Sequence, residues 1–195
     1  MPVPVISVWF DYGCPHSYKG LKLLENSPFE IGLEMDIKPF LLRHYSVDTD
    51  LVQRKVNIPT DTSRRPPLYK PGESTGTEPA SNRSTSTLAI HAATLYAKEI
   101  GLEKEFFWAA SKEYWERGTD LGNLYTIRRL AISIGIDWST MSPKLESGQY
   151  HSSVIAQHES ALNLGVTMVP SYLIAGRLHS GSIDPLEFER ATQKS

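Results

Sequence analysis

The alternation of hydrophobic and polar residues predicts a strand, a helix and a second strand within the first 40 positions. Residues 3–11 are rich in Val, Ile, Trp and Phe and carry no charge before Asp11, as in a strand buried on both faces. Pro15 suits the first position of a helix, and apolar residues follow it at helical spacing. Residues 31–40 then alternate with a period of two, which is typical of a strand. These elements predict a βαβ unit with parallel strands and a right-handed crossover.

The second half of the chain shows helical periodicity, followed by strands. The pattern predicts helices within 86–101, 102–118, 121–136 and 152–165. A strand entered through a proline follows at 166–176, then a short segment at 177–182 and a last helix with Asp184 as its N-cap. Without the helical block, the order is βαβ followed by ββα, the connectivity of an α/β thioredoxin-like fold with a large all-helical insertion.

This order divides the chain into three parts. Residues 1–45 and 165–195 form the predicted thioredoxin-like domain, and residues 87–164 form the helical insertion. Residues 46–86 are expected to be irregular, because proline, serine, threonine, glycine and charged residues dominate from Pro59 to Ser86. A segment of this kind is either a lid over a site or disordered, and the sequence does not decide between the two.

Composition narrows the classes of function. The 195 residues are 40% hydrophobic with a net charge of -2, and no cationic stripe indicates nucleic-acid binding. The six histidines lack metal-ligand spacing, so we expect no metal. No stretch is long and apolar enough to span a membrane, and the N-terminus lacks the basic leader of a signal peptide. We therefore expect a soluble protein, and the single unpaired thiol favours a cytoplasmic location.

The single cysteine, Cys14, stands where the first strand ends and the first helix begins. Ligands bind at this edge in open α/β folds, and the amides of a helix N-terminus lower the pKa of a thiol. His16 can add to this effect, and Ser17 places a hydroxyl in the first turn. We predict an exposed, reactive thiol with Cys14, His16 and Ser17 as catalytic residues. The alternative is that Cys14 is a small apolar core residue.

One thiol limits the chemistry. Dithiol enzymes resolve a mixed disulfide with a second cysteine, usually three residues further on, but Ser17 occupies that position here. The chain therefore cannot complete a dithiol cycle alone. The partner thiol comes from glutathione, another protein or a second copy of the chain, or else the thiolate is not consumed.

Two stretches, VWFDYGCPHSYKG and GVTMVPSYLIAGRLHSGS, with a helical block between them, resemble the DsbA-like branch of the thioredoxin superfamily. The similarity extends to cytoplasmic DsbA-type oxidoreductases, 2-hydroxychromene-2-carboxylate isomerases and kappa-class glutathione transferases. It implies a cis Val169–Pro170 peptide facing the thiol, glutathione as co-substrate, and a homodimer. Oxidoreductases of this group have cysteine at both positions 14 and 17, whereas the isomerases and transferases usually have serine at both, so this sequence is a hybrid.

The resemblance also suggests which residues hold the ligand. His91 matches a frequent histidine of the helical insertion, although Ser86 and Ala92 replace the expected asparagine and arginine. Ser182 and the start of the last helix match the transferase segment that binds the γ-glutamyl end of glutathione, with Ile183 as an extra residue. The predicted substrate- and glutathione-binding residues are Tyr12, Pro15, Tyr18, His91, Met168, Val169, Pro170, Ser182 and Asp184.

Three functions stay open at this point. The first is monothiol redox chemistry, in which Cys14 forms and releases a mixed disulfide. The second is glutathione-dependent transfer to, or cis-trans isomerisation of, a small aromatic molecule, which would survive replacement of Cys14 by serine. The third is a non-redox small-molecule enzyme or binding module, whose melting glutathione would not affect.

Overall fold

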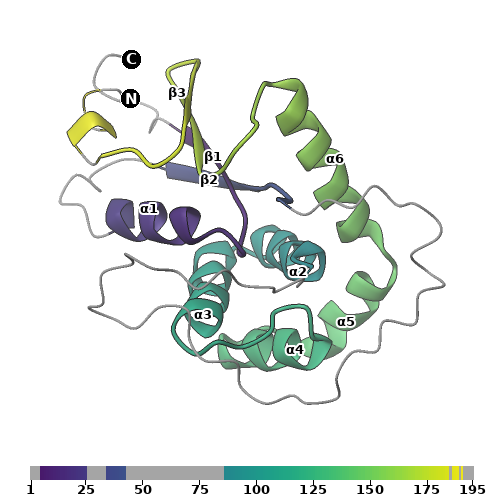
Figure 1. Ribbon diagram of the computed structural model, residues 1–195. Coiled ribbons are helices and arrows are strands. Elements are labelled where there is room, and N and C mark those ends of the chain that lie inside the picture. Colours follow the sequence, from purple (N-terminus) through teal and green to yellow (C-terminus); the bar gives the residue numbers. More distant parts are fainter. Residues whose placement is uncertain (1–4, 26–33, 43–85, 185, 189, 191–195) are drawn as a thin grey trace.

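The centre of the molecule is a mixed four-stranded sheet (Figure 1). The structure is a computed structural model that describes residues 5–25, 34–42, 86–184, 186–188 and 190. The strands are β1 (Val5–Phe10), β2 (Glu34–Pro39), β3 (Ser171–Ile174) and β4 (Arg177–Ser180), in the order β2-β1-β3-β4. β1 pairs parallel with β2 and antiparallel with β3, and β3 pairs antiparallel with β4. The predicted strands and the parallel βαβ pairing are confirmed.

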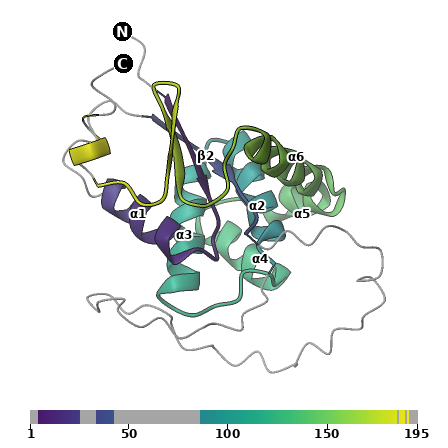
Figure 2. The same ribbon diagram turned by 45° about the horizontal axis from the view of Figure 1, so that its top comes forward.

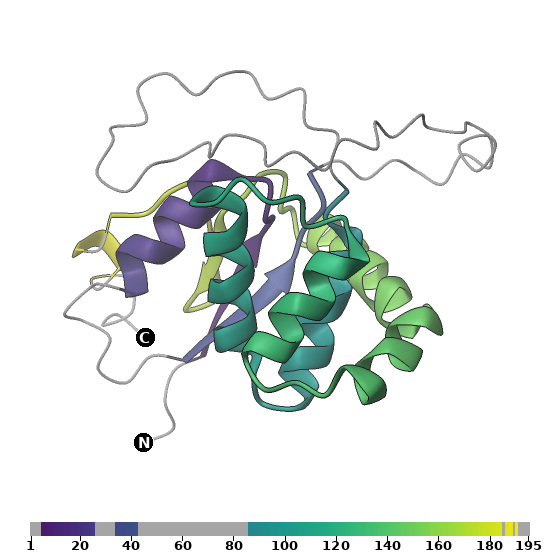
Figure 3. The same ribbon diagram turned by 90° about the horizontal axis from the view of Figure 1, so that it is seen from below.

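Six helices lie between β1 and β3 along the part of the chain that the structure describes. They are α1 (Pro15–Glu25), α2 (Leu88–Glu99), α3 (Glu103–Trp115), α4 (Leu124–Ser133), α5 (Trp138–Glu146) and α6 (Gln149–Asn163). Gly101 and Gly118 follow α2 and α3 with φ of 76° and 70°, the left-handed conformation predicted for a helix C-terminus. From below, α2, α3 and α4 lie together under the sheet (Figure 3).

Helix α5 was not predicted from the sequence. Pro143 lies inside it, and an interior proline normally argues against a helix because it removes a backbone donor. Its N-terminus is fixed by Asp137, whose carboxylate accepts a hydrogen bond from the Ser139 amide at 2.9 Å. Met141 and Leu145 are buried on one side of the helix, so tertiary packing outweighs the local preference.

The two faces of the sheet carry different clusters. Ile6, Val8 and Phe10 of β1 belong to the main core, which also contains Leu21 of α1. Trp9, which points to the other face, packs in a second cluster with Ala161 of α6. Helices α1 and α6 therefore cover opposite faces of the sheet (Figure 2).

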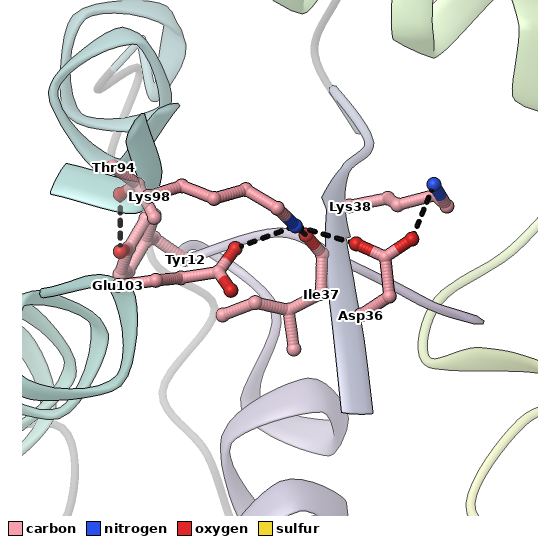
Figure 4. A network of polar contacts seen from close by, with 7 residues as sticks. All are labelled: Tyr12, Asp36, Ile37, Lys38, Thr94, Lys98 and Glu103. Atoms are coloured by element: carbon pink, nitrogen blue, oxygen red, sulfur yellow. Dashed lines mark hydrogen bonds and ion pairs between the residues drawn. The ribbon is translucent and has the colours of Figure 1, made fainter. Parts of the chain in front are cut away.

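A polar network joins the insertion to the edge strand β2 (Figure 4). Lys98 of α2 forms ion pairs with Asp36 of β2 at 2.5 Å and with Glu103 of α3 at 2.9 Å. Asp36 also pairs with its neighbour Lys38 at 2.6 Å. Lys98 thus connects three elements, and the half-buried position of these groups makes the pairs stronger than exposed ones.

The C-terminal part confirms the predicted ββα order and helix cap, and its two strands form a hairpin. Ala175 and Gly176 connect β3 to β4 with φ of 49° and 75°, the positive values that a two-residue hairpin turn requires. Asp184 accepts a hydrogen bond from the Leu186 amide at 2.9 Å and so caps the helical residues 186–188.

Two sequence predictions concern residues that lie outside the described ones. Residues 46–85 of the irregular segment lie outside the described residues, so the choice between a lid and disorder stays open. Ile31 and Leu33 of the second predicted strand also lie outside them. Among the described residues, no helix has both the length and the apolar composition to cross a membrane.

Candidate active site

Cys14 occupies the N-terminal cap position of α1, as predicted. Its backbone amide donates to the carbonyl of Asp11 at 3.0 Å, which closes the turn that leaves β1. Its own carbonyl accepts the amide of Tyr18 at 3.2 Å, the first hydrogen bond of the helix. The amide of Ser17 donates to Cys14 Sγ at 3.4 Å, so the sulfur takes the place of a capping oxygen. The free amides of the helix N-terminus therefore face the sulfur.

A second segment, 155 positions further along the chain, meets the sulfur. The Val169–Pro170 peptide bond is cis, and Cys14 Sγ donates a hydrogen bond to the Val169 carbonyl oxygen at 3.3 Å. The turn at the end of β1 and the segment before β3 are brought together because β1 and β3 are neighbouring strands. The predicted cis loop opposite the thiol is confirmed.

The predicted exposure of the thiol is wrong. Cys14 is only 4% exposed and packs in the second apolar cluster with Trp9, Phe40 and Val169. The cis loop covers the sulfur from one side, and Phe40, directly after β2, contributes to the same cluster. An incoming sulfur therefore needs a movement of these covering residues before it reaches Cys14.

Asp11 holds the segments around the site together. Its carboxylate is 3% exposed and accepts the amides of Gly13 at 2.7 Å and Leu42 at 2.8 Å. The Thr87 hydroxyl also donates to it, at 3.2 Å. One side chain thus connects the turn before Cys14, the segment after β2 and the segment before α2. Asp11 was not predicted from the sequence, although it is the first charge after a buried strand and stands three residues before the cysteine.

Two buried hydroxyls, one in the first turn of α1 and one beside Gly20 of α1, have no hydrogen-bond partner among the described residues. They are Ser17 Oγ and Tyr172 Oη, on residues that are 1% and 0% exposed. Burial raises the pKa of Tyr172, and the negative charge of an ionised Cys14 raises it further. Tyr172 was missed as well, because a tyrosine within a strand looks like ordinary core.

Tyr12 and His91 lie in the core and not at the thiol. The Tyr12 hydroxyl bonds Thr94 Oγ1 at 2.7 Å, and both rings pack against Phe10. His91 is 1% exposed, and burial, with a smaller contribution from the charge of His158, lowers the pKa of His91 to about 3. Both side chains pack in the core in this arrangement, and their predicted binding role stays a prediction.

Tyr18 faces α3. Its hydroxyl donates to Glu116 at 2.7 Å and accepts from Lys22 at 3.0 Å, and its ring stacks on Trp115. Burial raises the pKa of Tyr18 to about 12, so its hydroxyl remains protonated. Tyr18 therefore joins α1 to the insertion, and its predicted contact with substrate has no support in this arrangement.

The remaining predicted residues lie closer to the surface. His16 in the first turn of α1 and Met168 before the cis loop are exposed, and Pro15 is half-buried. Ser182 and Asp184 are exposed as well. Gly181, which precedes Ser182, donates its amide to the Pro170 carbonyl at 2.8 Å. This bond ties the predicted glutathione segment to the cis loop.

Comparison with solved structures places this arrangement among known proteins. A probable DsbA oxidoreductase from Streptomyces coelicolor is 21% identical, with a TM-score of 0.69 over 97% of this chain and 88% of that one. The cytosolic disulfide reductase DsbM from Pseudomonas aeruginosa, solved with GSH, is 14% identical, with a TM-score of 0.60 over 98% and 95%. A periplasmic thioredoxin-like protein from Salmonella enterica is 15% identical, with a TM-score of 0.61 over 99% and 84%. Identities this low establish a common fold and not a common activity.

The sequence comparisons give the family. No curated protein sequence matches this chain significantly. A family profile, however, matches residues 5–193, which is nearly the whole chain. The chain therefore belongs to the family of the DSBA-like thioredoxin domain.

Proposed function

We propose that this protein is a monothiol thiol-disulfide oxidoreductase that works with glutathione through Cys14. The observation that carries the proposal is the position of the sulfur, at the start of α1 and 3.3 Å from the carbonyl of the cis loop. Ser17 at the fourth position of the motif restricts the chemistry to one thiol per chain. The GSH in the structure of the similar DsbM supports glutathione as the partner.

The reaction balances with glutathione as the reductant. The Cys14 thiolate attacks the glutathione sulfur of a mixed disulfide, forms a Cys14–glutathione disulfide and releases the substrate thiolate, which takes up a proton. A second glutathione thiolate then attacks the glutathione sulfur of this adduct. Oxidised glutathione leaves and the Cys14 thiolate is regenerated. The net reaction converts one substrate–glutathione mixed disulfide and one glutathione thiol into one substrate thiol and one oxidised glutathione.

The residues around the sulfur have separate roles in this proposal. The Ser17 amide stabilises the thiolate when Cys14 is attacking or leaving. The Cys14–Val169 hydrogen bond breaks when Cys14 ionises, because an ionised sulfur has no proton to donate. Movement of the cis loop then uncovers the sulfur. Met168, exposed beside this loop, and Ser182, after β4, are the proposed contacts for glutathione.

The alternative function is glutathione-dependent transfer or isomerisation. The observation that favours it is Ser17, because the isomerases and transferases that the sequence resembles have serine at this position. In that chemistry the glutathione sulfur attacks a small molecule, and Cys14 only positions or activates it.

One experiment separates these functions. Wild type and Cys14→Ser are incubated with oxidised glutathione and weighed intact, and their melting is measured with and without reduced glutathione. Monothiol redox chemistry predicts one glutathionyl group on wild type, removed by reduced glutathione, and none on Cys14→Ser. Stabilisation of both proteins by reduced glutathione without an adduct would instead support the transferase or isomerase. No adduct and no stabilisation would contradict both and support a binding module or a non-redox enzyme.

We also propose a cytoplasmic location and a homodimer. A single unpaired thiol suits a reducing compartment, and one similar protein is cytosolic, although another is periplasmic. Cell fractionation and the solution mass of the purified protein test these two proposals.

A further inference from the structure

The segment that follows β2 contributes to the cover over the thiol. Phe40 is buried and packs in the same cluster of apolar side chains as Cys14. This residue lies beyond the strand, because β2 ends at Pro39. A segment beyond a strand no longer has the regular ladder bonds, so its amides need other acceptors. These acceptors determine how firmly the cover is held.

The three backbone amides after β2 have three different acceptors. The amide of Phe40 donates to a carbonyl of β1 at 2.9 Å, and that of Leu42 to the Asp11 carboxylate at 2.8 Å. The amide between them, that of Leu41, donates to Nδ1 of His158 in α6 at 3.2 Å. His158 therefore supplies an acceptor from α6 at the point where the pairing with β1 ends.

The ring of His158 also contacts the covering side chain. The ring centroids of His158 and Phe40 are 4.6 Å apart, and the ring planes meet at 70°, an edge-to-face arrangement. Ala161, three residues after His158, belongs to the cluster that contains Cys14. Since residues three apart are neighbours on a helix surface, one face of α6 packs against both the covering segment and the thiol cluster.

We propose that His158 is a positioning residue that keeps the thiol covered by accepting the hydrogen bond of the Leu41 amide. This role rests on the proposed function, in which the covered sulfur is the reacting group. Without the acceptor, the buried amide of Leu41 is unpaired while the segment covers the thiol, whereas water satisfies it when the segment moves away. Loss of the acceptor therefore favours the arrangement in which a reagent reaches Cys14.

The test is the rate at which iodoacetamide alkylates Cys14, followed by intact mass over a range of pH. The plateau rate at high pH, where the thiol is fully ionised, measures access to the sulfur. His158→Phe keeps an aromatic ring beside Phe40 and removes the acceptor. We expect its plateau rate to rise about fivefold or more, the effect of one unpaired buried amide on the covered state. An unchanged plateau rate would overturn the proposal.

His158→Asn is the rescue variant. The side-chain oxygen of asparagine is as many bonds from the backbone as Nδ1 of histidine, so it can accept the Leu41 amide, but the ring is lost. If the acceptor holds the cover, His158→Asn should react more slowly than His158→Phe and close to wild type. If the ring contact with Phe40 holds it, the order of the two variants reverses and the proposal fails.

Val154→Ala controls for a general loosening of α6. Val154 is buried on the same helix, one turn before His158, but packs in the main core. The variant should lower the melting temperature, because it removes buried methyl groups, and leave the plateau rate unchanged. Equal acceleration by Val154→Ala and His158→Phe would show that any destabilisation of α6 uncovers the thiol, contrary to the specific role of His158.

Alkylation needs no glutathione, so these results are independent of turnover. If Cys14 forms no glutathione adduct but His158→Phe still accelerates alkylation, the proposed function fails and the role of His158 holds. If the adduct forms and the variants react like wild type, the proposed function holds and the role of His158 fails.

Discussion

Two buried polar regions adjoin the end of β1, and they differ in how fully their hydrogen bonds are made. Around Asp11, a carboxylate that is 3% exposed accepts bonds from two backbone amides and a hydroxyl. Around Cys14, the hydroxyl of Ser17 has no partner among the described residues. The two regions are only three residues apart in sequence.

The difference separates a structural role from a chemical one. A carboxylate that accepts several bonds is strongly held and fixes the segments that donate to it. Donors without an acceptor stabilise nothing in the thiol state, but they become useful when a negative charge appears beside them. We infer that Asp11 builds the site and that the region around Cys14 changes during the proposed reaction.

The largest expected effect comes from replacing the unpartnered Ser17 hydroxyl with a second thiol. Residues three apart at a helix start are within the Cα separation that a disulfide spans, and the Ser17 amide already lies 3.4 Å from Cys14 Sγ. Ser17→Cys should therefore convert the monothiol protein to a dithiol one. Oxidised glutathione would then leave a protein lighter by two hydrogen atoms, in place of the stable adduct expected for wild type.

Ser111→Cys is the matched control for this change. Ser111 is 2% exposed, as buried as Ser17, but it lies in α3. This variant should retain the single glutathione adduct on Cys14. A persistent adduct on Ser17→Cys would show that position 17 does not reach the Cys14 sulfur, contrary to the geometry.

The next prediction tests the region around Asp11, whose hydrogen bonds are made. Asp11→Ala leaves the amides of Gly13 and Leu42 and the Thr87 hydroxyl without their acceptor. The cost should be about 3–5 kcal/mol, because three buried donors lose their acceptor at about 1–3 kcal/mol each. Urea unfolding measures it. Asp184→Ala, which removes an exposed helix cap, should cost only about 1 kcal/mol, and equal losses would contradict the structural role of Asp11.

Sequence reasoning predicted well where a local pattern decides the structure. The strand before Cys14, the helix that begins at Pro15 and the cap at Asp184 follow from periodicity, proline position and capping chemistry. The cis loop followed from resemblance and not from local rules, which permit either isomer at Val169–Pro170.

The failures concern contacts between distant segments. Burial of Cys14 depends on Phe40 and on the cis loop, so no window around the cysteine contains the information. The rings of Tyr12 and His91 turn toward Phe10 in the core, a packing that no local pattern at either position predicts. Helix α5 forms despite the proline inside it, Pro143, because Met141 and Leu145 are buried when the helix packs. In each case tertiary packing outweighs the local signal.

His91 extends the comparison to a third buried polar group and gives a smaller predicted effect than the loss of Asp11. His91 Nε2 has no hydrogen-bond partner among the described residues, and burial, helped by the charge of His158, lowers the pKa of His91 to about 3. Since the unfolded chain protonates this histidine near pH ~6.5, its neutral form contributes stability above that pH. That contribution is lost progressively as the pH falls from about 6.5 toward 3.

Unfolding of wild type and His91→Phe at several pH values measures this linkage. Phenylalanine keeps the packing against Phe10 and Tyr12 and cannot take up a proton. Between neutral pH and about pH 5, wild type should lose about 2 kcal/mol more than the variant, since stability falls wherever the unfolded state binds the extra proton. The carboxylates titrate in both proteins and cancel in the difference. Parallel stability profiles would mean that His91 takes up its proton in the folded state, and the unpartnered nitrogen would then have an acceptor or water that relieves its burial.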